Sequence, residues 1–447
     1  MKKILVLGAG RSATALIDYL LQHASEDDYG VIVADAQPDL AHQKVGGHWR
    51  GQGVGLDVAD VPRRRALIEA CDVVVSLLPP TLHVEVARDC LSLNRHLVTA
   101  SYISEELRAL DGEARARGLV FMNELGLDPG LDHMSAIQRI RHIQQRGGRI
   151  VAFYSATGGL VAPESDDNPW HYKFSWNPRN VVLAGQGMAQ YLEDGRLKLV
   201  PYHRLFSQYR LIHVPGLGAW EVYANRDSLK YREIYGLQQA KTLFRGTIRH
   251  RGFCDAWHAI VQLGLTEANF TIPNSKEMTY AGLVEALLGQ NASEGGLRKA
   301  VARLLNLELE GPVMRQLEWL GLFEERPIGI ESASPALALE QLLLEKWAMH
   351  PHDRDMIIMQ HLFEYDFQGQ HRRLTATLVA KGDDRTHTAM ARLVGWPAGI
   401  FARKLLLGAA APPGVSTPTH PEVYEPLLRE LERMGVRFTE EEEICSQ

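Results

Sequence analysis

The chain opens with a short apolar run, KILVLGA at residues 3–9, which leads through the turn GAGRSA (8–13) into a helical pattern. A GxGxxA motif between a strand and a helix is typical of sheets that bind dinucleotides. In such turns Gly8 permits the tight bend, Gly10 lets the backbone approach a pyrophosphate, and Ala13 lets the helix pack closely. The helix start then offers free N–H groups to phosphate. The first prediction is therefore an N-terminal dinucleotide-binding domain.

An acidic residue, Asp35, ends the next apolar run, YGVIVADA at 29–36, about 20 residues after the glycine motif. A carboxylate at this place accepts hydrogen bonds from the ribose hydroxyls and repels a 2′-phosphate. The following residues, Ala36-Gln37-Pro38, supply no arginine to neutralise such a phosphate. We therefore expect NAD to be favoured over NADP. The residues predicted to hold the cofactor are Gly8, Gly10, Arg11, Ser12, Ala13, Asp35 and Leu78.

Apolar runs alternate with helical stretches throughout residues 1–130. Near-continuous apolar runs indicate parallel strands that are covered on both faces, and their alternation with helices indicates a doubly wound α/β sheet of the Rossmann type. The predicted strands are 3–9, 29–36, 72–80, 96–101 and 119–126.

The pattern changes after Gly130. Alternating segments over 149–255 indicate a second, mixed α/β domain, and residues 260–350 carry only helical patterns, which indicates a small all-α insertion. Strand patterns return at 356–382, with a hairpin around Gln368-Gly369, and an amphipathic helix follows at 386–408. The predicted domains are 1–128 with 386–447 for the dinucleotide, 129–260 with 352–385 for substrate binding and dimerisation, and 261–351 for the insertion.

Composition excludes several classes of function. The net charge of −6 over 447 residues gives no basic surface for nucleic acid or an anionic membrane, and no apolar run reaches the ~20 residues that span a bilayer. The four cysteines are widely spaced, without a metal-type pattern, so we expect no metal site and a reducing, cytoplasmic location. These cysteines are Cys71, Cys90, Cys254 and Cys445.

Ligands of doubly wound sheets lie outside the carboxyl ends of the strands. Segments 76–80, 99–102 and 123–133 end there, and the last is rich in ionisable and turn residues. Asp128 is a candidate for chemistry in this segment, with a helix N-cap beside Pro-Gly as the alternative. Tyr102 is a second candidate, with a half-buried aromatic side chain as its alternative.

Two arginine-bearing segments in the second domain are suited to bind carboxylates. They are NRDS, with Arg226, and RGTIR, with Arg245 at its start. Guanidinium groups grip carboxylates in a bidentate manner, although each of these arginines could instead form a surface salt bridge. The Gly/Pro-rich segment 158–181 is too long for a plain connection, and loops of this length usually carry function.

Several long stretches point to one family. In chain order they are GAGRSA, VTASYISEEL, NELGLDPGLDHMSA, GGL-APE-DNP--YKFSW-PRNV, NRDS, RGTIR-RGF and TAMARLVGWPAGIFARKLL. Together they resemble the saccharopine reductase family (saccharopine dehydrogenase, glutamate-forming), and the resemblance covers essentially the whole chain. It implies a Rossmann domain, a mixed α/β domain and a small all-α domain around a cleft, in a homodimer.

The activity that this resemblance implies is oxidation of the secondary amine of saccharopine, a tricarboxylate, to glutamate and α-aminoadipate semialdehyde, or the reverse condensation, in lysine metabolism. Carried onto matching positions, Asp128 and Tyr102 would lie beside the amine, with roles of orientation and electrostatics. Ser101 and Tyr102 would help to hold the substrate, and Arg226, with Arg245 as second choice, would bind a carboxylate.

Some positions depart from the family pattern. Fungal members carry a cysteine where this chain has Thr157, and NADP-using members carry a Cys-Arg pair where it has Asp35-Ala36. An extra pair, Trp170-His171, precedes Tyr172. These changes leave two alternatives: a relative acting on another N-carboxyalkyl amine, of the carboxynorspermidine or opine type, and a dinucleotide-binding scaffold without turnover.

Overall fold

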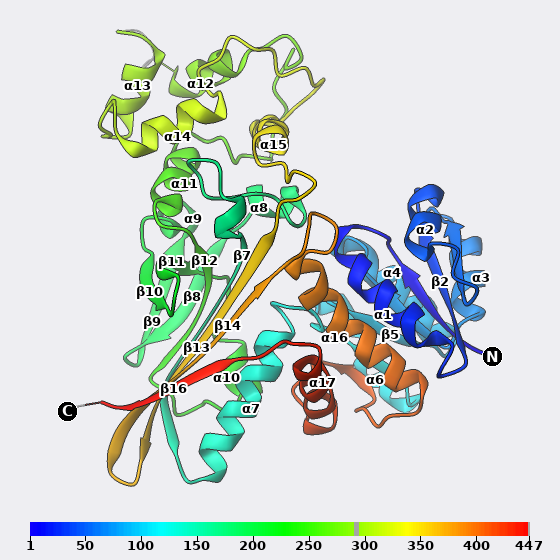
Figure 1. Cartoon of the computed structure of the whole chain (residues 1–447). Coiled ribbons are helices and arrows are strands. Elements are labelled where there is room, and N and C mark those ends of the chain that lie inside the picture. Colours follow the sequence, from blue (N-terminus) through cyan, green and yellow to red (C-terminus); the bar gives the residue numbers. More distant parts are fainter. Residues whose placement is uncertain (290–294, 446–447) are drawn as a thin grey trace.

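The structure is a computed structural model that describes residues 1–289 and 295–445 (Figure 1). It contains a seven-stranded sheet and a nine-stranded sheet. Figure 1 shows the first sheet with its helices as one lobe, the second sheet as another, and a group of helices beyond one end of the second sheet. The predicted class, a Rossmann-like α/β lobe with a mixed α/β lobe and a helical part, is confirmed.

All strands of the first sheet run parallel, in the order β15-β6-β5-β4-β1-β2-β3. The chain reverses its winding direction between β1 and β4, which is where such sheets bind ligands. Five strands match the predicted apolar runs, while β3 and β15 were not predicted. The strands are β1 (Lys2–Leu7), β2 (Tyr29–Asp35), β3 (Gly51–Gly55), β4 (Val73–Ser76), β5 (His96–Thr99), β6 (Val120–Met122) and β15 (Gly414–Ser416).

Helices pack on the first sheet and bury its apolar side chains in two clusters, one on each face. Helix α16 packs against β1, β4 and β5 and lies against α1. The helices of this lobe are α1 (Thr14–Ala24), α2 (Pro38–Val45), α3 (Val61–Glu69), α4 (His83–Ser92), α5 (Glu105–Arg108), α6 (Asp111–Ala116), α16 (Ala389–Leu406) and α17 (Pro421–Arg433).

The second sheet is mixed, as predicted. Its order is β10-β11-β12-β7-β13-β14-β16, and β8 pairs with both β12 and β9. Only β12 and β7 pair in parallel, and the long hairpin of β13 and β14 turns at Gln368-Gly369. The strands are β7 (Arg149–Val161), β8 (Met188–Glu193), β9 (Arg196–Pro201), β10 (Arg210–Val214), β11 (Gly218–Ala224), β12 (Thr242–Arg249), β13 (Asp355–Phe367), β14 (Gln370–Lys381) and β16 (Thr439–Ile444).

The remaining helices connect the second sheet to the helical part of the molecule. Between residues 263 and 354 the described residues form helices and no strand. Around the second sheet lie α7 (Leu131–Gln145), α8 (Pro178–Val182), α9 (Tyr202–Leu205), α10 (Tyr231–Ile234) and α11 (Phe253–Gln262). The helical part contains α12 (Tyr280–Leu288), α13 (Leu297–Leu304), α14 (Pro312–Leu320) and α15 (Pro335–Lys346).

The exact residues at which we expect the domains to begin and end stay a prediction. One segment divides differently from what we expected: within 386–447, β15 joins the first sheet, whereas β16 pairs with β14 of the second sheet. The C-terminal segment therefore contributes to both lobes, although we assigned it wholly to the first.

Helix α16 is attached to both lobes. Its first turn is held by Asp355 of β13, whose Oδ1 accepts a hydrogen bond from the N–H of Ala389 (2.6 Å) and whose Oδ2 accepts one from Met390 (2.9 Å). Further along, a Cβ on Gly395 would lie 2.8 Å from the backbone nitrogen of Leu16 in α1. The absence of a side chain there lets α16 pack directly on α1, so the helix begins on the second sheet and continues along the first lobe.

Candidate active site

The glycine turn lies at the carboxyl end of β1. Gly8 has φ of 99°, and a Cβ there would lie 3.0 Å from the carbonyl oxygen of Leu77, so the position requires glycine. A Cβ on Gly10 would meet nothing within 4 Å, which means that this backbone faces open space. The turn thus offers the exposed backbone and helix start that a pyrophosphate needs. These residues fit a dinucleotide.

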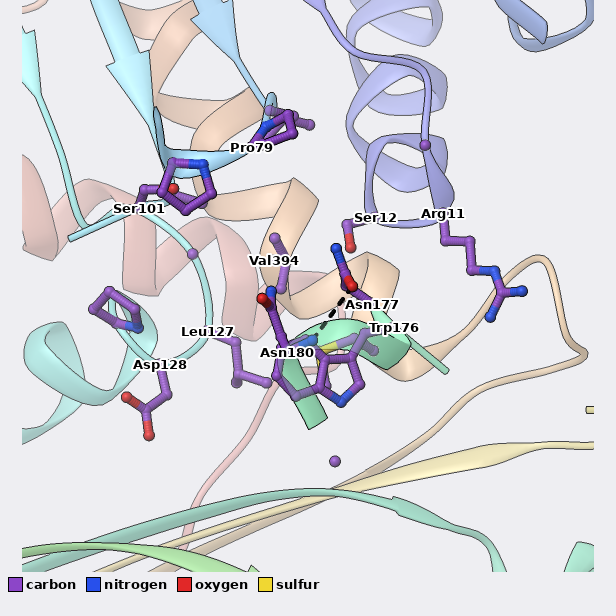
Figure 2. A pocket seen from close by; sticks show the side chains of 18 of the residues that line it. Arg11, Ser12, Pro79, Ser101, Leu127, Asp128, Trp176, Asn177, Asn180 and Val394 are labelled. Carbon is purple, nitrogen blue, oxygen red and sulfur yellow. Dashed lines mark hydrogen bonds between the residues drawn. The ribbon is translucent and has the colours of Figure 1, made fainter. Parts of the chain in front are cut away.

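A cavity of about 700 Å³ lies between the carboxyl ends of the first sheet and the second lobe, within the usual range for ligand sites. In Figure 2, Arg11 and Ser12, in the turn that precedes α1, lie across the view from Asp128, with Trp176 and Asn177 also in the wall. The predicted site residues that line this cavity are Gly10, Arg11, Ser12, Ala13, Leu78, Ser101 and Asp128.

Arg11 links the two lobes at the cavity mouth. Its Nη1 donates a hydrogen bond to the carbonyl oxygen of Phe174 (3.3 Å), which belongs to the long Gly/Pro-rich segment of the second lobe. The same segment brings Trp176 and Asn177 to the cavity. The prediction that this segment does more than connect two strands agrees with its position.

The carboxylate of Asp128 lies at the centre of a buried ionic cluster. Its Oδ1 accepts hydrogen bonds from Nη2 of Arg245 (2.6 Å) and from the hydroxyl of Tyr102 (3.3 Å). The same guanidinium nitrogen donates to Oδ2 of Asp132 (2.7 Å). The N-cap of α7 is Gly130, without a side-chain cap, so Asp128 does not serve as the helix cap that we considered as an alternative.

Burial and neighbouring charges shift the pKa values of Asp128 and Asp132 in opposite directions. Burial raises the pKa of Asp128, with Arg245 opposing and Asp132 reinforcing the shift. For Asp132, burial also acts to raise the pKa, but His133 and Arg245 outweigh it and the net shift is downward. The pKa of the Tyr102 hydroxyl is raised by burial and by Asp128, so this phenol stays neutral and donates its proton to the hydrogen bond. Asp128 is therefore the carboxylate that takes up a proton more readily.

A second layer of buried polar groups lies behind this cluster. Glu124 accepts hydrogen bonds through Oε2 from His133 Nε2 (2.9 Å) and the Tyr231 hydroxyl (3.1 Å), while His133 Nδ1 contacts the Tyr235 hydroxyl (2.5 Å). The ring of Tyr231 also lies under the Arg245 guanidinium, 4.4 Å from Cζ to the centroid. Nothing in the local sequence pattern distinguishes Glu124 or the two tyrosines from ordinary core residues, so the sequence alone does not predict their place here.

Ser101 is held by a buried histidine. The hydroxyl of Ser101 lies 2.7 Å from His83 Nε2, and the hydroxyl of Ser76 lies 2.9 Å from His83 Nδ1. Burial lowers the pKa of His83 to about 4, so the ring is neutral at physiological pH and connects the ends of β4 and β5. This residue was also missed, because a single histidine inside a helical pattern carries no distinguishing signal.

The arginines have three different surroundings. Arg226 is exposed, with Cζ 5.4 Å from the centroid of the Tyr102 ring. Arg245 is buried and already shared by two carboxylates, so its surroundings differ from those expected for a substrate ligand. Arg249, four residues further along β12, lines the cavity, is only 3% exposed and forms no ion pair with any described residue. We had noted Arg249 in its motif but had not assigned it a role.

Arg249 is held mainly by backbone and aromatic groups. Its Nη1 donates to the carbonyl of Ile248 (2.9 Å), its Nη2 to the Tyr223 hydroxyl (3.4 Å), and its Nε has no partner in the described part of the chain. A guanidinium stays charged even when buried, and a buried charge normally has a partner. Its place in the cavity wall therefore indicates a site for an anion.

Sequence comparison finds relatives along the whole chain. The chain is 32% identical over 450 residues to saccharopine dehydrogenase [NADP(+), L-glutamate-forming] of Schizosaccharomyces pombe, covering 99% of each. It is 33% identical to the Saccharomyces cerevisiae protein of the same name, covering 98% of this chain and 99% of that one. It is 34% identical to alpha-aminoadipic semialdehyde synthase of Arabidopsis thaliana, of which it spans only 45%.

Structural comparison agrees with the sequence. The apo, histidine-tagged saccharopine dehydrogenase (L-Glu forming) from Saccharomyces cerevisiae superposes with a TM-score of 0.88 at 32% identity, covering 99% of this chain and 100% of that one. Homospermidine synthase from Legionella pneumophila in complex with NAD gives a TM-score of 0.58 at 10% identity, over 100% of this chain and 92% of that one. The second likeness shows a shared fold alone.

The predicted preference for NAD over NADP was wrong. The fungal relatives, including one from Pyricularia oryzae, bear NADP(+) in their names, and the matching N-terminal family model is described as NADP binding. The structure shows why Asp35 misled us. Its Oδ2 accepts a hydrogen bond from the N–H of Ala9 (2.8 Å) and its Oδ1 one from Gln37 (2.9 Å). Because both oxygens brace backbone turns, the carboxylate has a structural task that its sequence position does not reveal.

No described helix has the length and apolar character to span a bilayer. Two family models together cover most of the chain: the saccharopine dehydrogenase NADP binding domain matches residues 4–122, and the saccharopine dehydrogenase C-terminal domain matches residues 126–436. With full-length relatives above 30% identity, the chain belongs to the saccharopine dehydrogenase family.

Proposed function

We propose that this chain is a saccharopine dehydrogenase that oxidises saccharopine to L-glutamate and α-aminoadipate semialdehyde, or runs the reverse condensation, with NADP(H). One observation carries the proposal. One cavity is lined by the exposed glycine turn, by Asp128 and by the guanidinium of Arg249, which forms no ion pair with a described residue. The names of full-length relatives support the choice of substrate and of NADP.

The chain would hold the dinucleotide through the turn that precedes α1. The backbone N–H groups at Gly10 to Ser12 and the Ser12 hydroxyl would receive the phosphates, and Leu78 also lines the cavity. When bound, the dinucleotide supplies the acceptor for the hydride that leaves the lysine-derived Cε of the substrate. The residues of the chain bind and orient the amine against this acceptor.

Three carboxylates on the substrate call for cations in the cavity. Arg249 is the first assignment, because its buried charge would be neutralised by a substrate carboxylate. Arg226, which does not line the cavity but lies over the ring of Tyr102, is the second. Arg245 receives a different role from the one first expected: its two ion pairs place Asp128, so we assign it as a positioning residue. Thr157, whose buried Oγ1 has no partner among the described residues, lines the same cavity and is free to bind a polar substrate atom.

The chemistry that the residues must support is the cleavage of a carbon–nitrogen bond after oxidation. Loss of hydride gives a C=N bond, water adds to its carbon, and the carbinolamine breaks its C–N bond to release glutamate and the semialdehyde. One proton is released overall. Asp128, with its raised pKa, accepts a hydrogen bond from the substrate amine or water, and Tyr102 keeps the carboxylate oriented.

The test is a spectrophotometric assay of reduced dinucleotide with saccharopine and NADP⁺, beside NAD⁺ and beside N-carboxyalkyl amines of the opine and carboxynorspermidine types. We expect saccharopine with NADP⁺ to be the best pair. Arg249→Met should raise the KM for saccharopine by about 100-fold, because it removes the charge that pairs with a carboxylate, and should leave NADP⁺ binding unchanged. Arg251→Met, an exposed neighbour, is the matched control.

Either of two results would overturn this assignment. Faster turnover of another amine would move the chain to one of the alternative substrate classes, and NADP⁺ binding without turnover of any amine would make it a scaffold. Equal KM values for the Arg249 and Arg251 variants would remove Arg249 from the substrate site.

We also propose that two copies of the chain associate. The side chains of Leu197 and Leu199, two residues apart on the edge strand β9, are both more than half exposed and form an apolar patch on the second lobe, which we call the β9 strip. A reducing compartment such as the cytosol remains our proposal for the location, supported by four free cysteines, three of them buried.

A further inference from the structure

Two histidines and an aspartate meet beside the active-site cavity, and the proposed function uses none of them. Asp166 and His171 lie in the long segment after β7, and His250 follows directly after β12. One ligand atom from each lies within 4.8 Å of the other two. In the described part of the chain this is the only group of three or more His, Cys, Asp or Glu side chains gathered so closely.

The three side chains of this group contact one another directly. Nδ1 of His171 lies 2.6 Å from Oδ2 of Asp166, and the rings of His171 and His250 stack with their centroids 3.9 Å apart. The second oxygen of Asp166, Oδ1, is buried and has no hydrogen-bond partner among the described residues. A buried carboxylate oxygen without a donor is costly, and a cation is one group that would satisfy it.

The ring of His250 is oriented by its neighbours. Its Nδ1 lies 3.1 Å from the carbonyl oxygen of Arg251, and the Trp220 ring packs edge-on against it at 5.2 Å. When Nδ1 donates to that carbonyl, the lone pair remains on Nε2. Metal-binding histidines are commonly held in this way, with the other ring nitrogen bonded to a backbone carbonyl.

We propose that Asp166, His171 and His250 bind a divalent transition metal ion, with Zn²⁺ as the ion that suits them best. Imidazole nitrogens and a carboxylate oxygen are common Zn²⁺ ligands, at bond lengths of about 2.0–2.2 Å. Donors around one such ion lie within about 4 Å of each other, compared with 4.8 Å here. Because an imidazole binds a metal in its ring plane, the stacked rings of His171 and His250 must rotate until a lone pair of each faces the ion. The ion would replace the hydrogen bond between His171 and Asp166.

The position of the site gives the ion a structural consequence. It would join the segment that carries Trp176 and Asn177 to the end of β12, where His250 directly follows Arg249. All three of these cavity residues would then be fixed relative to one another. His171 is part of the extra Trp-His pair in this sequence, so the site is not expected in relatives that lack the pair. The effect on saccharopine KM rests on the proposed function, whereas metal binding itself does not.

The experiment measures metal binding directly on the untagged full-length protein after removal of metal with a chelator. Zn²⁺ titration by calorimetry should give one ion per chain with a Kd at or below about 1 µM. Co²⁺ should give the visible absorption of a four- or five-coordinate ion. His171→Ala, His250→Ala and Asp166→Asn should each weaken binding by at least about 10-fold, and His203→Ala, an exposed histidine outside the group, should not.

Thermal unfolding supplies a second measurement. Zn²⁺ should raise the Tm of the wild type and of His203→Ala, because an ion that binds only the folded chain stabilises it, and at the same Zn²⁺ concentration should raise the Tm of the three site variants less. Asp166→Asn keeps the size of the side chain, so the test survives if a histidine variant fails to fold. Wild-type Zn²⁺ affinity equal to that of Asp166→Asn, or Co²⁺ spectra insensitive to all three substitutions, would overturn the site. Neither result depends on turnover.

Discussion

Nη2 of Arg245 lies 2.6 Å from Oδ1 of Asp128, and the same nitrogen pairs with Asp132 at 2.7 Å. One buried cation is thus shared by two carboxylates. Arg245→Met should leave both anions unpaired and lower the free energy of unfolding by about 3–5 kcal/mol, measured by urea denaturation. Adding Asp132→Asn to this variant should recover part of the loss. If the free energy of unfolding falls by less than about 1 kcal/mol, as for an exposed ion pair, Arg245 does not hold the two carboxylates as we infer.

Asp128→Asn should reduce kcat by about 100-fold, because it removes the carboxylate beside the reacting amine. Burial raises the pKa of Asp128 above its ordinary value of 3.8, so wild-type activity should fall as the pH is lowered through this raised pKa. The variant should lack that acid limb. Asp132→Asn is the matched control and should retain it. Full turnover of Asp128→Asn at every pH would exclude the assigned role.

Acid should destabilise the protein through His83. Burial lowers its pKa to about 4 in the folded chain, from an ordinary 6.5, so between these values the unfolded state binds the extra proton. Stability is therefore complete above about pH 6.5 and is lost as the pH falls toward 4. Between pH 7 and pH 5 this one group should cost about 2 kcal/mol. His83→Gln should show a smaller difference between urea unfolding curves at the two pH values; an unchanged difference would rule out this contribution.

Gly395→Ala should destabilise the protein although alanine favours helices. Its Cβ would lie 2.8 Å from the backbone nitrogen of Leu16, and relief of that overlap should cost about 1–3 kcal/mol. Gly112→Ala in α6, where a Cβ meets nothing within 4 Å, should instead stabilise by about 0.5–1 kcal/mol. Thermal unfolding of both variants checks the pair. Stabilisation by both substitutions would mean that α16 does not need this close approach.

The proposed dimer makes a prediction about mass in solution. Light scattering should give twice the mass of one chain for the wild type and the mass of a single chain for Leu199→Glu. Leu407→Glu is the control, because Leu407 is 50% exposed and Leu199 is 52% exposed, but Leu407 lies at the end of α16 on the first lobe. If both variants dissociate, or if neither does, the β9 strip is not the contact between the two copies.

Strands could be predicted from the sequence where the apolar pattern was strong. β1 and β4 contain unbroken runs of buried apolar residues, Ile4–Leu7 and Val73–Val75, and the hairpin of β13 and β14 has long paired strands. β3 was missed because its sequence, GQGVG, has almost no apolar side chains; it forms because glycine allows close packing, and a Cβ on Gly53 would lie 2.7 Å from the backbone of His42. Three-residue β15 is too short to leave a pattern.

The active-site residues show the same contrast between those that a local sequence pattern predicts and those that it does not. Asp128, Ser101 and the glycine turn stand next to turns at strand ends, where topology alone predicts that ligands bind, and they do line the cavity. Glu124, His83 and Arg249 owe their importance to burial and to partners far away in the chain. The NAD prediction failed for a related reason, because the hydrogen-bond partners of Asp35 are set by the folded backbone.

Helix α16 begins under Asp355 of the second sheet and continues against α1 of the first lobe, while Met390 and Val394 on its first turns line the cavity. One continuous helix therefore contacts both sheets and also forms part of the cavity wall. A displacement of α16 along its axis would move that wall and change the separation of a bound dinucleotide from a bound amine.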